Sequence, residues 1–121
     1  MWAIVAGTLL VGMSSTSWAV DIEIEDPEDD VEIDDSSDIN AHGTCAFANV
    51  AYTLKITNIY TRNGQQTINT HTVQGTTDSE GIWTDSSSFT VYGAGTWEVQ
   101  VWLNSDPTEK DSHDGNVGPT F

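Results

Sequence analysis

Three histidines, 19 acidic residues and a run of serines are the side chains that could support chemistry in this chain. His42, His71 and His113 are far apart in the sequence, and the serines at 86–88 have no paired base nearby. The sequence shows neither a nucleophile motif nor a glycine-rich phosphate loop after a strand. Two carboxylates for glycoside hydrolysis cannot be singled out among so many acids. We therefore expect a protein that is not an enzyme.

Carboxylates are also ligands for hard cations such as calcium. The densest acidic run, residues 21–38, holds 11 of the 19 acids and no base, but its spacing matches no known calcium loop. The cluster from Asp111 to Asn116 is more typical of a turn than of a metal site. Cys45 is the only cysteine, which excludes an internal disulfide and a cysteine-based zinc site. We expect no cofactor, with calcium as the alternative left open.

The formal net charge of −16 limits the class of partner. Nucleic acids and anionic lipids are bound through lysine and arginine, and this chain has only Lys55, Arg62 and Lys110. Two explanations of the acidity remain open. It is either an adaptation to high salt in a halophilic source or a local acidic segment on an ordinary domain.

The first twenty residues carry no charge and contain an apolar run of signal-peptide length. Ser17 and Ala19 are small residues at the positions that precede a cleavage site. Residues 1–20 are therefore predicted to be a hydrophobic helix, either a cleaved signal peptide or a retained anchor. Trp2 and Trp18 fit the anchor, because about 24 Å of helix separates them, enough for a thin bilayer. Both alternatives export the rest of the chain.

Residues 21–40 are predicted to be an acidic linker, because like charges at this density repel and extend a chain. Within it, Val31 and Ile33 alternate with acids as in a strand. These two residues are candidates for an edge strand or for contact with a partner.

Residues 41–104 are predicted to form a β-domain. Apolar and polar residues alternate from Val50 to Thr57, which indicates a half-buried strand. Asn63-Gly64 is typical of a type I′ hairpin turn, and a threonine-rich return strand follows from Gln65 to Val73. The most regular alternation runs from Trp97 to Leu103. Several short strands with glycine-rich turns predict an all-β fold.

A resemblance to immunoglobulin-like extracellular domains, of the fibronectin type III or bacterial-adhesion kind, is carried by two segments. Phe89-Thr-Val-Tyr-Gly-Ala-Gly-Thr-Trp-Glu-Val-Gln-Val-Trp-Leu103 is similar to their penultimate hairpin, and Tyr52-Thr-Leu-Lys-Ile-Thr-Asn58 is similar to a core strand near their start. The resemblance implies a small antiparallel β-sandwich in an extracellular setting and carries no site.

Such domains end on one further strand, whereas residues 105–121 are polar and rich in turn residues. We therefore expect a polar C-terminal tail and an open sheet edge beside Trp97–Leu103. An open edge exposes unpaired backbone groups and invites a strand. We expect the edge to be filled, either from within the chain, at Val31–Ile33 or around Val117, or by a neighbouring subunit. The threonine-rich return strand from Gln65 to Val73 is a second, less apolar edge.

Export, threonine-rich strands, acidity and missing catalytic motifs together favour a structural or adhesive subunit of a surface assembly. The expected location is extracytoplasmic: secreted, anchored at the outer face of a membrane, or on a virion surface. The expected partners are proteins or further copies of the chain, and a membrane if residues 1–20 are retained. The alternative is a carbohydrate-binding module, which would use an outward Trp102 together with Trp83.

Overall fold

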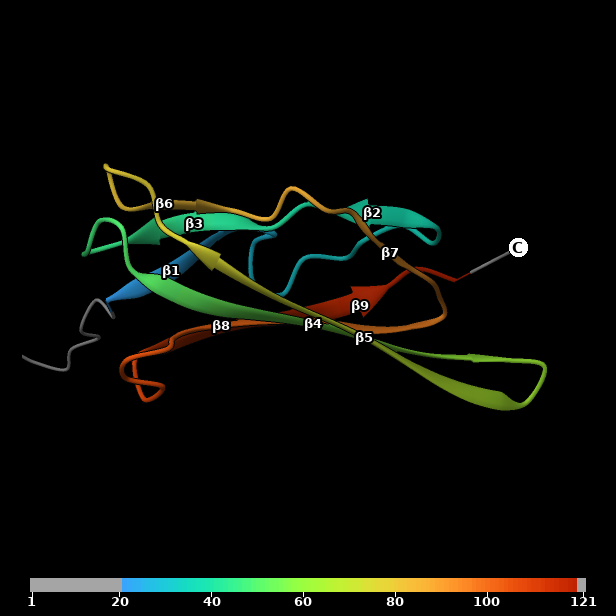
Figure 1. The fold of residues 1–121 in the computed structure, drawn as a ribbon. Coiled ribbons are helices and arrows are strands. Elements are labelled where there is room, and N and C mark those ends of the chain that lie inside the picture. Colours follow the sequence, from blue (N-terminus) through green and yellow to red (C-terminus); the bar gives the residue numbers. More distant parts are fainter. Residues whose placement is uncertain (1–20, 120–121) are drawn as a thin grey trace, which may run out of the picture.

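The computed structural model describes residues 21–119, which form nine β-strands and no helix. The predicted all-β class is confirmed (Figure 1). The strands are β1 (Ile22–Asp26), β2 (Ser37–Ile39), β3 (His42–Cys45), β4 (Ala51–Arg62), β5 (Gln65–Thr76), β6 (Ile82–Thr84), β7 (Phe89–Val91), β8 (Gly95–Leu103) and β9 (Lys110–Val117). In the described residues there is no helix long and apolar enough to cross a membrane. The expected signal peptide or anchor lies outside them.

Four strands form the larger antiparallel sheet, in the order β5-β4-β8-β9. The alternation predicted for β4 and β8 places their apolar side chains on one face, where Ile56 lies directly opposite Val99. The predicted hairpin joins β4 to β5. Asn63 and Gly64 have φ angles of 52° and 76°, the left-handed values that a type I′ turn requires.

The opposite layer consists of two smaller antiparallel sheets, β1-β3-β6 and β2-β7. β2 is followed closely by β3, and β6 by β7, so these two sheets continue one another along the layer (Figure 1). All of their strands are short, three to five residues. The long strands of the molecule therefore lie in one layer, and the second layer covers its apolar face.

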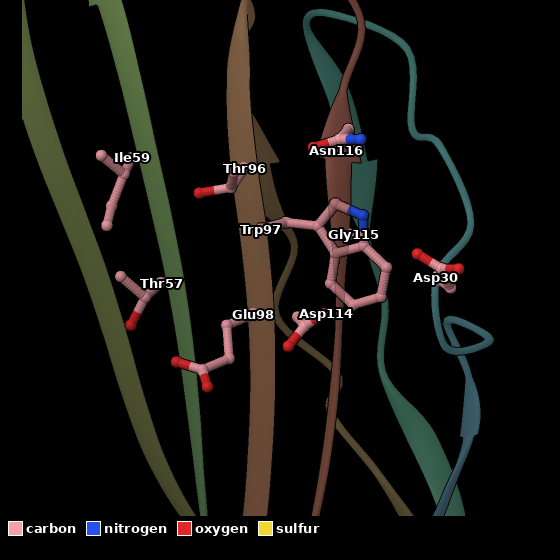
Figure 2. A pocket seen from close by; sticks show the side chains of 9 residues that line it. All are labelled: Asp30, Thr57, Ile59, Thr96, Trp97, Glu98, Asp114, Gly115 and Asn116. Atoms are coloured by element: carbon pink, nitrogen blue, oxygen red, sulfur yellow. The ribbon is translucent and has the colours of Figure 1, made fainter.

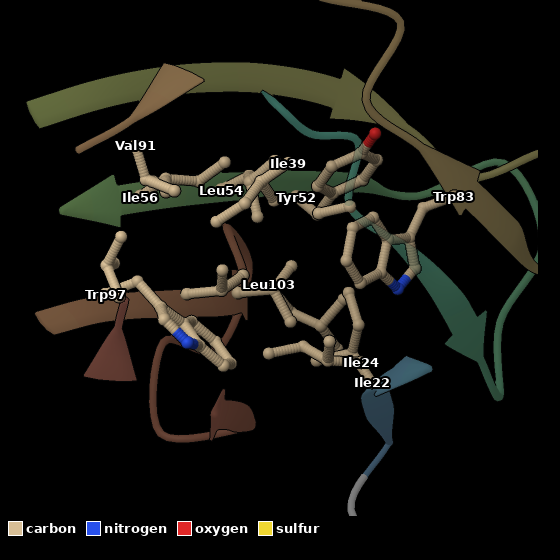
Figure 3. Packing of buried hydrophobic residues seen from close by; sticks show 14 residues of the cluster. Ile22, Ile24, Ile39, Tyr52, Leu54, Ile56, Trp83, Val91, Trp97 and Leu103 are labelled. Carbon is tan, nitrogen blue, oxygen red and sulfur yellow. The ribbon is translucent and has the colours of Figure 1, made fainter. Parts of the chain in front are cut away.

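One hydrophobic core fills the space between the two layers (Figure 3). Trp83 of β6 is 1% exposed and packs on Tyr52 of β4, with ring centroids 5.5 Å apart. Trp97 of β8 is equally buried, as the alternation predicted. Burying two indoles and a phenol removes a large apolar area from water, which is the main stabilising contribution in a domain of this size.

The segment expected to be an acidic linker contributes β1 and β2 to the two-layer fold. Ile22 and Ile24 are buried in the core, whereas the acids that alternate with them, Glu23 and Glu25, are exposed. A period of two places these charges on the wet face of β1. Dense charge therefore does not keep this segment out of the fold.

The segment expected to be a polar tail contains a strand, since β9 pairs with β8 along its whole length. Val117 at its end is buried in the core, but two of its other inward side chains are polar and bonded. Asp111 Oδ2 accepts a hydrogen bond of 2.9 Å from the Ile24 N–H, and His113 Nδ1 lies 2.8 Å from the Pro27 carbonyl oxygen. The sequence pattern does not reveal β9 because polar partners take the place of the apolar alternation that identifies a strand.

Candidate functional site

The long edge strand β5 is the part of the described chain best placed to meet another molecule. β5 pairs with β4 over all twelve of its residues, from Arg62–Gln65 to Ala51–Thr76. No other strand of residues 21–119 pairs with its second side. An edge strand presents unpaired N–H and C=O groups, which form a template for a further strand.

The register identifies which residues of β5 face that free edge. A two-residue turn makes Arg62 and Gln65 a hydrogen-bonded pair, and in an antiparallel ladder such pairs recur at every second residue. Odd-numbered residues of β5 therefore bond to β4, and the Thr77 N–H continues the series by donating to the Val50 carbonyl at 2.9 Å. The free backbone groups belong to the even-numbered residues Gln66, Ile68, Thr70, Thr72, Gln74 and Thr76.

This edge carries no charge in a molecule with 19 acids. β5 contains no aspartate, glutamate, lysine or arginine, and no acid occurs anywhere from residue 39 to residue 77. The charged residues of the β4–β5 hairpin are Lys55 and Arg62, and Arg62 pairs with Asp35 at 2.9 Å. The side chains of the even-numbered residues are exposed, including Ile68 at 59%. The hairpin is thus a neutral to weakly basic arm on an acidic body.

The opposite edge of the same sheet, β9, is covered from within the chain. The Ile33 N–H donates to the Asn116 carbonyl at 2.9 Å, and the Gly118 N–H donates to the Ile33 carbonyl at 2.7 Å. The Asp30 N–H bonds to the Asp114 carbonyl at 2.7 Å. The edge beside β8 is therefore filled from within the chain by β9, which ends at Val117, one of the donors predicted for it, and residues 30–33 then cover β9.

Val31 and Ile33, named as contact candidates, thus take part in the fold. The Val31 carbonyl accepts a 2.9 Å hydrogen bond from the Trp97 indole N–H, and the Val31 side chain remains 39% exposed. Ile33 is half-buried and forms a parallel bridge with Val117. Val31 thus bonds the acidic segment to β8, and Ile33 bonds it to β9.

The two tryptophans proposed for sugar binding have different environments. Trp102 is half-buried on the outer face of the larger sheet, between Thr53 of β4 and Lys110 of β9. Trp83 is buried in the core, and its indole N–H donates to the Glu23 carbonyl at 3.1 Å. The prediction that Trp83 binds sugar is therefore wrong, and Trp102 is the one tryptophan of the two that could contact a sugar.

A polar cluster joins β5 to the opposite layer. The carboxylate of Asp85 is buried, and its Oδ1 accepts hydrogen bonds from the Ser87 hydroxyl at 2.6 Å and the Ser87 N–H at 3.0 Å. His71 Nε2 lies 3.0 Å from Ser87 Oγ and 3.6 Å from Asp85 Oδ2. A catalytic relay needs one ring nitrogen toward the serine and the other toward the acid. Here the same nitrogen, Nε2, faces both the serine and the acid, so the cluster is suited to holding β5 against the opposite layer and not to catalysis.

The same buried carboxylate acts on a neighbouring phenol. Burial, and then the negative charge of Asp85, raises the pKa of Tyr52 above its ordinary value of 10.0. A 3.4 Å hydrogen bond from the phenol to the Thr84 carbonyl opposes this shift. Tyr52 therefore stays a neutral donor well into the alkaline range.

An acidic groove of about 360 Å³ crosses the outer face of β4, β8 and β9 (Figure 2). Glu98 and Asp114 lie opposite each other on adjacent strands, and Asp30 borders the same groove. Its sides are formed by threonine and asparagine side chains and by Ile59. Like charges directly opposite are destabilising, so this groove concentrates repulsion.

Metal binding gains no support from the described residues. Within residues 21–119, no group of three or more histidine, cysteine, aspartate or glutamate side chains is arranged to hold a metal ion. The carboxylates of the acidic segment are spread along β1 and beside β9 and do not converge.

The β5 strand is predicted from the sequence, but the sequence does not identify it as a contact surface for another molecule. The signal that could have indicated the site is the acid-free interval of residues 39–77 in so acidic a chain. The edge position of this threonine-rich strand is predicted from the sequence and is confirmed by the strand order.

No protein-family model matches this chain, and no curated protein matches it. The function is therefore inferred from the geometry and charge of residues 21–119.

Proposed function

We propose that the chain is a non-catalytic structural or adhesive subunit of an extracytoplasmic surface assembly, joined to its neighbour by strand addition at β5. The observation that carries this proposal is the twelve-residue edge strand without charge and without a second partner strand in the described residues. Cell envelopes, pilus-like filaments and virions are the kinds of assembly that use such subunits.

The contrast between the two edges of the larger sheet supports the proposal. Monomeric proteins protect their sheet edges with charged side chains, a covering segment or a very short strand. This chain covers β9 with residues 30–33 and places acids along that side. Within residues 21–119 it leaves β5 long, neutral and uncovered, although the chain contains 19 acids. A protein selected to remain monomeric would be expected to protect both edges of the sheet.

The fold that we propose for this role is immunoglobulin-like, of the fibronectin type III or bacterial-adhesion kind. A layer ordered β1-β3-β6 facing a layer ordered β5-β4-β8-β9 supports it, and β9 supplies the last strand that such a domain requires. The hydrophobic segment 1–20 supports an extracytoplasmic location, whether it is cleaved or retained.

Hydrogen exchange tests strand addition even while the partner is unidentified. In the isolated chain, the amides of Ile68, Thr70 and Thr72 should exchange fast because they face the free edge, whereas those of Asn69 and His71 should be protected by β4. In the assembly isolated from its natural source, the even-numbered amides should become protected as well. Fast exchange at these amides in the assembly contradicts strand addition at β5.

A carbohydrate-binding module remains the second candidate, because Trp102 is half-buried on the open face of the sheet. An indole beside Thr53 and Lys110 offers a stacking surface with polar neighbours. A glycan array separates the two functions. Binding of a defined glycan by the wild-type chain that is lost in Trp102→Ala overturns the structural role, and an array without binding supports it.

A further inference from the structure

We infer that the strand added at β5 is the β5 strand of a second copy of this chain, paired antiparallel about a twofold axis. The inference rests on the proposed function and names the partner of the same edge. Such a contact uses the same surface patch on both copies. It would join two four-stranded sheets into one continuous sheet of eight strands.

The other strand edges in residues 21–119 are unsuited to the same contact. β9 is covered by residues 30–33. The free side of β1 is occupied by side chains, because the N–H groups of Ile24 and Asp21 donate to the carboxylates of Asp111 and Glu109. β2, β6 and β7 have three residues each. Of the described strands, a second copy can therefore offer only β5 as a long unprotected partner.

Charge restricts the direction from which a second copy can approach. Each chain carries a net charge of −16, so two copies repel unless their acidic sides point apart. Residues 22–33, the first part of the acid-rich segment, lie on the β9 side of the molecule, where β1 and residues 30–33 contact β9, whereas Asp35 pairs with Arg62 of the hairpin. Pairing β5 with β5 puts the two neutral arms in contact and places both acidic edges at the outside of the joined sheet.

The residues of the edge fit a self-complementary contact. An antiparallel register centred on His71 places Thr70 opposite Thr72 of the second copy, and Ile68 opposite Gln74. β-Branched and amide side chains make favourable cross-strand pairs, and none of these pairs brings like charges together. The exposed Ile68 side chain would be partly covered by Gln74 of the second copy, which removes apolar surface from water.

Sedimentation equilibrium of the full chain, over a concentration series at 0.15 M and 2 M NaCl, tests the inference. We expect a reversible dimer whose dissociation constant falls as salt screens the repulsion. Thr70→Pro should raise that dissociation constant about tenfold or more, because it removes an N–H that faces the free edge. The substitution leaves the hydrogen bonds between β5 and β4 intact, because the Thr70 N–H is not one of their donors. Thr70→Ala keeps this N–H and loses only the side-chain pair with Thr72 of the second copy, so it should raise the dissociation constant much less than Thr70→Pro does.

Charge variants test the same contact without a change of backbone. Thr70→Asp should prevent dimerisation, whereas Thr96→Asp should not, because Thr96 faces the same open side from β8, away from the edge. A monomer at every salt and concentration overturns self-pairing. If its β5 amides are nevertheless protected in the natural assembly, the strand comes from another protein and the proposed function stands. Dimers that survive both Thr70→Pro and Thr70→Asp also overturn the inference.

Discussion

Asn58 is a fully buried polar side chain that holds the segment after β7 against β8. Its Nδ2 donates to the carbonyls of Tyr92 and Thr96 at 3.1 and 3.0 Å, and its Oδ1 accepts from the Tyr92 N–H at 2.9 Å. Asn58→Ala leaves these backbone groups buried and unpaired, which should lower the free energy of unfolding by about 2–4 kcal/mol. Urea unfolding followed by tryptophan fluorescence measures the change.

Asn69 provides the matched control for this substitution. It faces inward from the edge strand β5 and is half-buried. Asn69→Ala should change the free energy of unfolding by about 1 kcal/mol or less. Equal losses from the two substitutions would show that the bonds of Asn58 do not determine its contribution.

Tyr52 should give the protein a loss of stability at alkaline pH. Its pKa is raised in the folded state, mainly by burial and then by Asp85, so the unfolded chain releases the phenol proton first. Its contribution to stability is fully present below the ordinary pKa of 10.0 and is lost as the pH rises from there toward the folded-state pKa. Thermal melts from mildly to strongly alkaline pH should show a shallower decline for Tyr52→Phe than for the wild type. Parallel declines in the two proteins contradict this cause.

At the scale of elements, the cover over β9 is the feature most open to test. Ile33→Pro removes the N–H that bonds to Asn116, and Ile33→Val retains it with nearly the same side chain. We expect the proline variant to expose the β9 edge and to aggregate on gentle heating, whereas the valine variant should behave like the wild type. Light scattering during a thermal ramp measures the difference. A soluble proline variant would show that residues 30–33 do not protect the edge.

The elements predicted from sequence are those with a regular apolar period. The alternation of β4 and β8 and the Asn-Gly turn before β5 follow from local chemistry and are confirmed. β9 could not be predicted in this way, because Asp111 and His113 face inward with partners that lie more than 80 residues away. β1 does show an alternation, at Ile22 and Ile24, but its place in the core depends on pairing with β3 and could not be predicted. The Asp85 cluster could not be predicted either, because His71 comes from β5 in one layer and Asp85 and Ser87 follow β6 in the other.

Over the whole molecule, the charge is divided unevenly between two sides. Glu98 and Asp114 lie opposite each other beside Asp30, and residues 30–33 of the acidic segment follow β9, whereas β5 is neutral. The Debye length falls from about 10 Å at 0.1 M salt to about 3 Å at 1 M, so added salt should relieve this repulsion. We expect the melting temperature to rise with NaCl up to molar concentration, as scanning calorimetry would measure.

Neutralising one acid of the groove locates the source of the salt effect. Asp114→Asn should raise the melting temperature at low salt and reduce its dependence on NaCl. Glu80→Gln removes the same charge from an exposed loop and should change either quantity less. Equal effects of the two variants would assign the salt response to net charge and not to the acidic side. A melting temperature that is independent of salt contradicts both explanations.

The start of β1 and the tip of the β4–β5 hairpin lie at opposite ends of the two-layer fold (Figure 1). A mechanical load applied between these ends runs along the strands. The hydrogen bonds between antiparallel strands are perpendicular to that direction, so all bonds of a ladder bear the load together and do not open one after another. Two subunits joined at β5 would resist stretching along their strands and would separate most easily when pulled sideways, across the β5 edge.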